Sequence, residues 1–135
     1  MRDAVVLIME EGRAREREQT LFYRGLAVEA SERGDVELAD RLNALHADEQ
    51  HHLSRLTARI LELGGEPEEL AFRPVQVPPP EAWEEIARVR EEGEVAWYAA
   101  RLADPVDPVT RELFQEILDS ERHHSRELGG KWMSA

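Results

Sequence analysis

The 135-residue sequence contains no cysteine, few aromatic residues and no long hydrophobic run. The absence of cysteine excludes disulfides, iron–sulfur clusters and thiolate zinc sites. The only apolar run near the N-terminus, residues 4–9, is too short for a signal peptide, and nothing reaches the length of a membrane span. We therefore expect a cytoplasmic protein without a membrane partner.

Positive charge is also scarce, because 17 Lys and Arg residues stand against 29 Asp and Glu residues, for a formal net charge of -12. This charge argues against binding to nucleic acid or to anionic membranes. What the chain does contain is 41% hydrophobic and 34% charged residues, a composition typical of a globular, highly helical protein. Its length suits one domain, residues 1–135.

Apolar residues recur at three- and four-residue spacing in four stretches, which predicts helices over about 3–33, 36–63, 81–102 and 108–128. Asp35 and Asp107 are expected to cap the second and fourth helices, since aspartate side chains accept hydrogen bonds from first-turn N–H groups. Glycines at 34, 64 and 65 and at 129 and 130 are placed to end the preceding helices.

Between the second and third helices lies a proline-rich linker, about residues 64–80, with five prolines after Glu66. Such a segment is extended and, at ~3.1 Å per residue, can reach about 50 Å. The second helix, at ~1.5 Å per residue, is about 40 Å long. The linker can thus run the whole length of a bundle, which predicts two helical hairpins joined by a long crossover.

Two Glu-x-x-His units lie on apolar helix stripes: Glu49 with His52, and Glu121 with His124. Each predicted hairpin also has one lone glutamate, Glu16 in the first and Glu91 in the second. Counted along the helices from the hairpin's turn, this glutamate and the glutamate of the Glu-x-x-His unit differ in position by about 5 Å or less. Carboxylates that face a core are costly unless their charge is offset. If the hairpins fold face to face, four carboxylates and two imidazoles converge, and two divalent or trivalent cations would balance them.

This ligand set is the one described for ferritin-like di-iron and di-manganese carboxylate proteins. Carboxylate and imidazole ligands without sulfur favour iron or manganese, and zinc is compatible with them. We expect two iron ions, with manganese or a mixed pair as the alternative.

The whole pattern, including a tyrosine seven residues after each lone glutamate, resembles the ferritin-like superfamily over nearly the entire chain. Within it, the chain is most similar to the di-iron domain of rubrerythrins, because Glu94 follows Glu91 on the third predicted helix. The resemblance implies an all-α, ferritin-like four-helix bundle and an iron ion that shifts between Glu94 and His52. The first half has Gln19 where the second has Glu94. The predicted metal ligands are Glu16, Glu49, His52, Glu91, Glu94, Glu121 and His124.

The sequence leaves the roles of several residues open. Either Glu91 or Glu94 could be an ordinary solvated charge, although we favour both as ligands. Tyr23 and Tyr98 either hydrogen-bond metal-bound carboxylates or are core aromatic residues. His51 and His123 are assigned to the surface. His46 is assigned to a partly buried structural position, although it could also reach the site. The tryptophans at 83, 97 and 132 are assigned to packing or oligomer contacts.

For function, the resemblance implies a di-iron oxidoreductase that reduces peroxide or O2. Rubrerythrins usually carry a rubredoxin domain with four cysteines, which this chain lacks, so an external electron donor is expected. A homodimer or higher homo-oligomer is also expected. The alternatives are a ferroxidase or iron-storage protein, and a bundle with a structural metal that serves as a scaffold or binding module.

Overall fold

The computed structural model describes residues 3–71 and 73–129, and within these ranges it contains four α-helices and no strand. The prediction of an all-α chain is thereby confirmed. The helices are α1 (Ala4–Glu32), α2 (Val36–Glu62), α3 (Trp83–Arg101) and α4 (Pro108–Glu127). Trp132 and the glycine at 130 lie outside the described residues.

The helix bounds agree with the predicted ones to within about two residues. The largest difference is the start of α3, where Pro80, Glu81 and Ala82 form a turn and the Ala82 N–H donates to the Pro79 carbonyl. A search of the described residues for a helix long and apolar enough to cross a membrane finds none.

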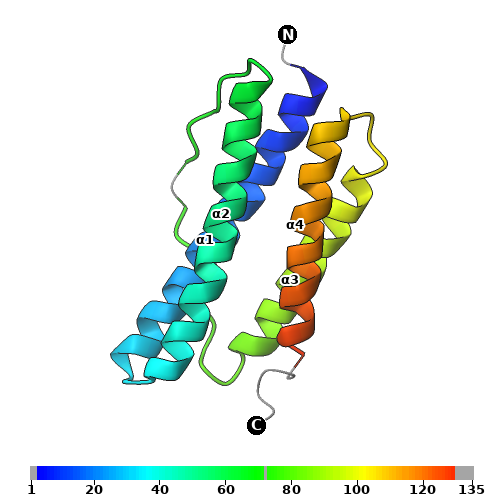
Figure 1. Ribbon diagram of the computed structural model, residues 1–135. Coiled ribbons are helices and arrows are strands. Elements are labelled where there is room, and N and C mark those ends of the chain that lie inside the picture. The colour runs from blue at the N-terminus through cyan, green and yellow to red at the C-terminus, as the bar shows by residue number, and fades with distance from the viewer. Residues whose placement is uncertain (1–2, 72, 130–135) are drawn as a thin grey trace. The chain divides into compact units, whose positions relative to one another are not determined.

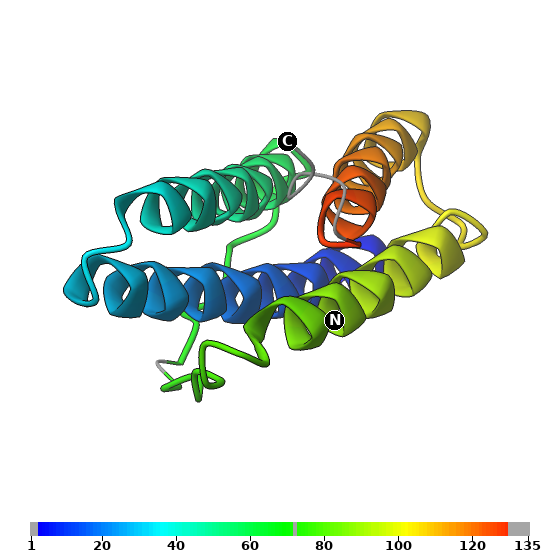
Figure 2. The same ribbon diagram turned by 90° about the horizontal axis from the view of Figure 1, so that it is seen from below.

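The chain divides into two compact units, residues 1–77 and 78–135. The first unit is the hairpin of α1 and α2, which lie side by side and antiparallel (Figures 1 and 2). Its turn is made by Gly34, whose φ of 79° is the left-handed conformation that glycine adopts most readily. Asp35 caps α2 as predicted, because its side chain accepts a hydrogen bond from the Leu38 N–H at 3.1 Å.

The linker returns along this hairpin, as Figure 1 shows for the segment that follows α2. Gly65 packs near Val6 at the start of α1. The Glu68 N–H donates to a carboxylate oxygen of Glu10 at 2.6 Å. Val77 then lies against Gly25, more than five helical turns along α1 from Val6. The predicted long crossover is confirmed.

A buried ion pair fastens the crossover to both helices. Arg13 donates to the Glu10 carboxylate, to the Thr57 hydroxyl at 2.9 Å and to the Glu68 carbonyl at 3.0 Å. Arg13 and Glu10 are each only 8% exposed. One guanidinium thus joins α1, α2 and the linker, which we call the crossover clamp (Glu10, Arg13, Thr57 and Glu68). No pattern in the sequence points to these residues.

The close approach at Gly25 supplies a stability test. A β-carbon there would lie 2.5 Å from the Val77 Cγ2 atom, whereas one at Gly93 in α3 would meet nothing within 4 Å. Both glycines are inside helices, so Gly→Ala removes a helix penalty of roughly 1 kcal/mol at each. We expect Gly93→Ala to stabilise the protein and Gly25→Ala to be less stable than Gly93→Ala by about 1–3 kcal/mol, as overpacking is. Urea unfolding of both variants measures this. Equal stabilisation by the two substitutions would show that Val77 moves away from position 25 without loss of stability.

The second unit is the hairpin of α3 and α4, also antiparallel neighbours (Figure 1). Asp107 caps α4 by accepting hydrogen bonds from the Thr110 N–H at 3.0 Å and the Thr110 hydroxyl at 2.6 Å. An aromatic cluster packs the hairpin, since Tyr98 has edge contacts with both Trp97 and Phe114. These contacts hold the two helices in the register that positions the polar residues described next.

Candidate metal centre

In the first hairpin, α1 and α2 bring Glu16, Glu49 and His52 together. The His52 Nδ1 atom lies 3.3 Å from a Glu49 oxygen and 3.5 Å from a Glu16 oxygen. One potential ligand atom from each of the three lies within 4.8 Å of the other two. Glu16 and Glu49 are 0% exposed and His52 6%. We call these residues the first Glu/His group.

The second hairpin repeats the arrangement with Glu91 from α3 and Glu121 and His124 from α4. The His124 Nδ1 atom lies 3.2 Å from a Glu121 oxygen and 3.6 Å from a Glu91 oxygen. The two glutamates are 0% exposed and the histidine 2%. This second Glu/His group has the same composition as the first, and in both groups the Nδ1 atom of the imidazole faces the two carboxylates.

Helical spacing explains both groups. In each Glu-x-x-His unit the two side chains lie one turn apart on the same face, which is also the apolar face of the helix. The lone glutamate comes from the antiparallel neighbour at the same depth. The sequence therefore places three polar side chains where a hydrophobic layer would otherwise pack.

The third-helix glutamates are both buried, Glu91 completely and Glu94 at 4% exposure. The alternative that one of them is a solvated surface charge is therefore wrong. In the described part of the chain, however, Glu94 does not belong to the second Glu/His group. Its role as a ligand stays a prediction, as do the roles of the six group members. Gln19, which occupies the matching place in α1, is 2% exposed.

The other singled-out residues also have definite positions. Tyr23 and Tyr98 are completely buried, and their contact with metal-bound carboxylates stays a prediction. His46 is partly buried and its Nδ1 atom lies 3.0 Å from the Thr20 carbonyl oxygen, a structural hydrogen bond. His51 and His123 are exposed, as predicted.

Burial and charge act in opposite directions on His52. Burial by itself lowers the pKa of the imidazole, because the charged form loses its hydration. Hydrogen bonds to Glu16 and Glu49 and the negative charges of these carboxylates outweigh burial and raise the pKa from 6.5 to about 9. In the metal-free protein, a proton thus occupies the position facing both carboxylates at neutral pH.

This pKa predicts a pH dependence of stability for the metal-free protein. Because the folded-state pKa lies above the unfolded one, the stabilisation is fully present below pH 6.5 and is lost as the pH rises through about 9. We expect the free energy of unfolding to fall over this range by on the order of 3 kcal/mol. Urea unfolding in chelator at several pH values measures it. His52→Gln should flatten the slope and the exposed His123→Gln should keep it; a slope that survives His52→Gln would contradict the assignment.

The donor atoms suit a metal ion of borderline or hard character. Each group offers carboxylate oxygens and one imidazole nitrogen, without sulfur. Two nearly solvent-free carboxylates beside one imidazole leave negative charge even when the imidazole is protonated, and buried charge of that kind calls for a counter-ion. The residues present therefore fit a cation in each group.

A known protein family matches most of this chain. The profile of the family described as Rubrerythrin matches residues 8–130. The chain belongs to the rubrerythrin family. The match covers all six group members and Glu94, and it spans both hairpins of this rubrerythrin-family chain. No curated protein matches it.

Solved structures similar to this rubrerythrin-family chain include two bacterioferritins. That of Desulfovibrio desulfuricans, solved with its di-iron site in different catalytic states, is 25% identical, with a TM-score of 0.87 over 93% of this chain and 76% of that one. That of Rhodobacter capsulatus, with a metal-free dinuclear site and haem iron, is 21% identical, with a TM-score of 0.86 over 95% and 83%. The chain has the ferritin-like four-helix-bundle fold, as predicted.

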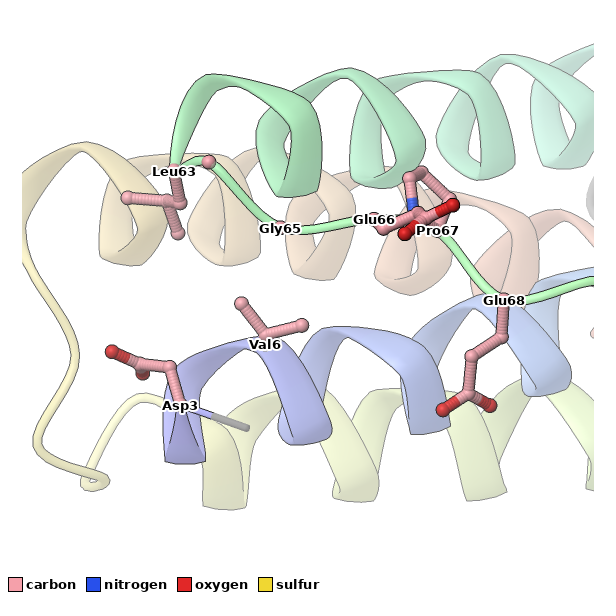
Figure 3. Close-up of a pocket in the computed structure, with 8 residues that line it drawn as sticks. Asp3, Val6, Leu63, Gly65, Glu66, Pro67 and Glu68 are labelled. Atoms are coloured by element: carbon pink, nitrogen blue, oxygen red, sulfur yellow. The ribbon is translucent and has the colours of Figure 1, made fainter. Parts of the chain in front are cut away.

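A pocket at the open end of the α1–α2 hairpin is separate from these groups (Figure 3). It lies between the start of α1 and the beginning of the crossover, and Figure 3 shows Asp3 and Val6 on one side and Gly65 and Pro67 on the other. None of its lining residues is a predicted ligand.

Proposed function

We propose that the two Glu/His groups act together and hold two iron ions in a centre that reduces peroxide. The observation that carries the proposal is the repetition of one buried ligand set, two carboxylates and one imidazole, in each hairpin of a rubrerythrin-family chain. On this proposal the two hairpins form one domain. The di-iron site named for the similar bacterioferritin supports the metal and its number.

If two iron ions are bound, they would supply the two electrons that reduce peroxide to two molecules of water, a reaction that also takes up two protons. The chain's own residues do the rest. The carboxylates would neutralise the metal charge in a site that excludes water, and the imidazoles of His52 and His124 would complete the ligand set. Glu94, buried on the same helix as Glu91, supplies a further carboxylate for a ligand exchange.

The alternative is a ferroxidase or iron-storage protein, which the two bacterioferritin likenesses favour. The two functions differ in which oxidant is preferred and in whether iron accumulates. In both functions the oxidised metal must be reduced again or replaced. Peroxide reduction requires an external electron donor for this.

An anaerobic titration followed by stopped-flow mixing distinguishes them. We expect about two Fe(II) per chain, and oxidation of the bound Fe(II) that is faster with H2O2 than with O2. Faster oxidation by O2, with growth of a mineral core when Fe(II) is in excess, would favour the ferroxidase. If the metal stabilises the protein but neither reagent oxidises it, the metal is structural. Binding of fewer than two ions per chain would contradict a centre formed by both Glu/His groups.

A further inference from the structure

A groove on the first hairpin has features of a ligand site that the metal centre does not use. It lies between α1, α2 and the crossover and has a volume of about 590 Å³. That volume is within the range of small-molecule sites in proteins, roughly 300–1,000 Å³. The groove contains none of the predicted metal ligands. Its walls include Leu53, Ala58, Leu61 and Leu70, and its polar lining includes Arg13 and Arg17.

The two arginines differ in their contacts. Arg13 belongs to the crossover clamp and is fully engaged there. Arg17, one helical turn later on the same face of α1, is half-buried. Its Nε atom is shielded from solvent and has no hydrogen-bond partner among the residues that the structure describes. A buried donor without a partner costs roughly 1–3 kcal/mol, so native structures seldom keep one without a reason. A bound anion would supply the missing acceptor.

The surroundings of Arg17 define the class of anion. A guanidinium presents its N–H groups as a planar fork that matches a carboxylate. Glu68 and Glu69, whose exposed side chains also line the groove, disfavour a ligand with several negative charges. The leucines instead suit an apolar chain, and Leu61 is 58% exposed, so covering it removes apolar surface from water. We propose that this groove binds a monocarboxylate with an apolar tail, its carboxylate on Arg17.

Octanoate is the probe for the test. It is added to the 135-residue chain at concentrations below the micelle threshold of octanoate, and binding is followed by NMR of the protein amides. We expect saturable shifts at residues of the groove. Arg17→Gln should weaken binding at least about tenfold, since a charge-assisted hydrogen bond is lost. The matched control is Arg24→Gln, because Arg24 is an exposed arginine of the same helix outside the groove. It should bind as the unaltered chain does.

Several outcomes would overturn the proposal. Octan-1-ol binding as tightly as octanoate would show that the carboxylate is not recognised. Equal weakening by Arg17→Gln and Arg24→Gln would show only an effect of overall charge. Displacement of octanoate by inorganic phosphate at a lower concentration would assign the groove to a different anion. The melting temperature of Arg17→Gln, expected to be no lower than that of the unaltered chain, verifies that any loss of binding is not a loss of fold. The test is independent of the metal, so failure of the proposed iron centre would not affect it.

Discussion

Replacement of Glu49 with alanine should lower the rate of Fe(II) oxidation by at least about a hundredfold. Removing partners that merely orient metal ligands already costs about 10–100-fold in affinity or activity, and a direct ligand should cost more. Glu49 is completely buried beside His52, so no solvent-exposed carboxylate can take its place. Glu121→Ala should have an effect of the same size, because it occupies the equivalent position in the second hairpin. The initial rate after anaerobic loading with Fe(II) is the measurement.

The control is Glu18→Ala, which removes an exposed carboxylate from α1 and should leave the rate unchanged. Stability separates loss of a ligand from loss of fold. The melting temperature of Glu49→Ala without metal shows what the substitution does to the fold itself. With metal, Glu49→Ala should lack the increase in melting temperature that ligand binding gives. Unchanged oxidation in both Glu49→Ala and Glu121→Ala would exclude the proposed centre.

Replacement of Arg13 with alanine should destabilise the protein by about 3–5 kcal/mol, the cost of removing one partner from a buried ion pair. Glu10, which is 8% exposed in the unaltered chain, would lose its charged partner, and the Thr57 hydroxyl and the Glu68 carbonyl would each lose a donor. Since whole domains are stable by only about 5–15 kcal/mol, this is a large share. Urea unfolding of the metal-free protein measures it.

A matched control is Arg41→Ala, which breaks an exposed ion pair with Glu37 of 3.5 Å and should cost less than about 1 kcal/mol. The double variant Glu10→Leu/Arg13→Met should recover much of the loss, because it removes both charges and fills the space. A single-variant effect no larger than that of Arg41→Ala would mean that the clamp does not hold the crossover in solution.

The sequence was sufficient for those features that local chemistry decides. Helical periodicity located all four helices, and the side chains of Asp35 and Asp107 cap helices as their chemistry predicts. The inward glutamates and histidines were also predictable, since burying a charged residue costs free energy and such residues are unusual on the apolar face of a helix. Burial of both Glu91 and Glu94 decided a question on which the sequence left an alternative.

Only the tertiary structure revealed features that depend on segments far apart in the chain. The crossover clamp joins Arg13 to Thr57 and Glu68, and no periodicity links those positions. The one local signal was the opposite charge of Glu10 three residues before Arg13, a spacing that is common on solvated helices and therefore uninformative. The approach of Val77 to Gly25 was hidden for the same reason. Arg17 likewise resembled any surface arginine until the crossover closed one side of its groove. Local propensity and the cost of buried charge can be read residue by residue, whereas contacts across a long connection exist only once the chain has folded back on itself.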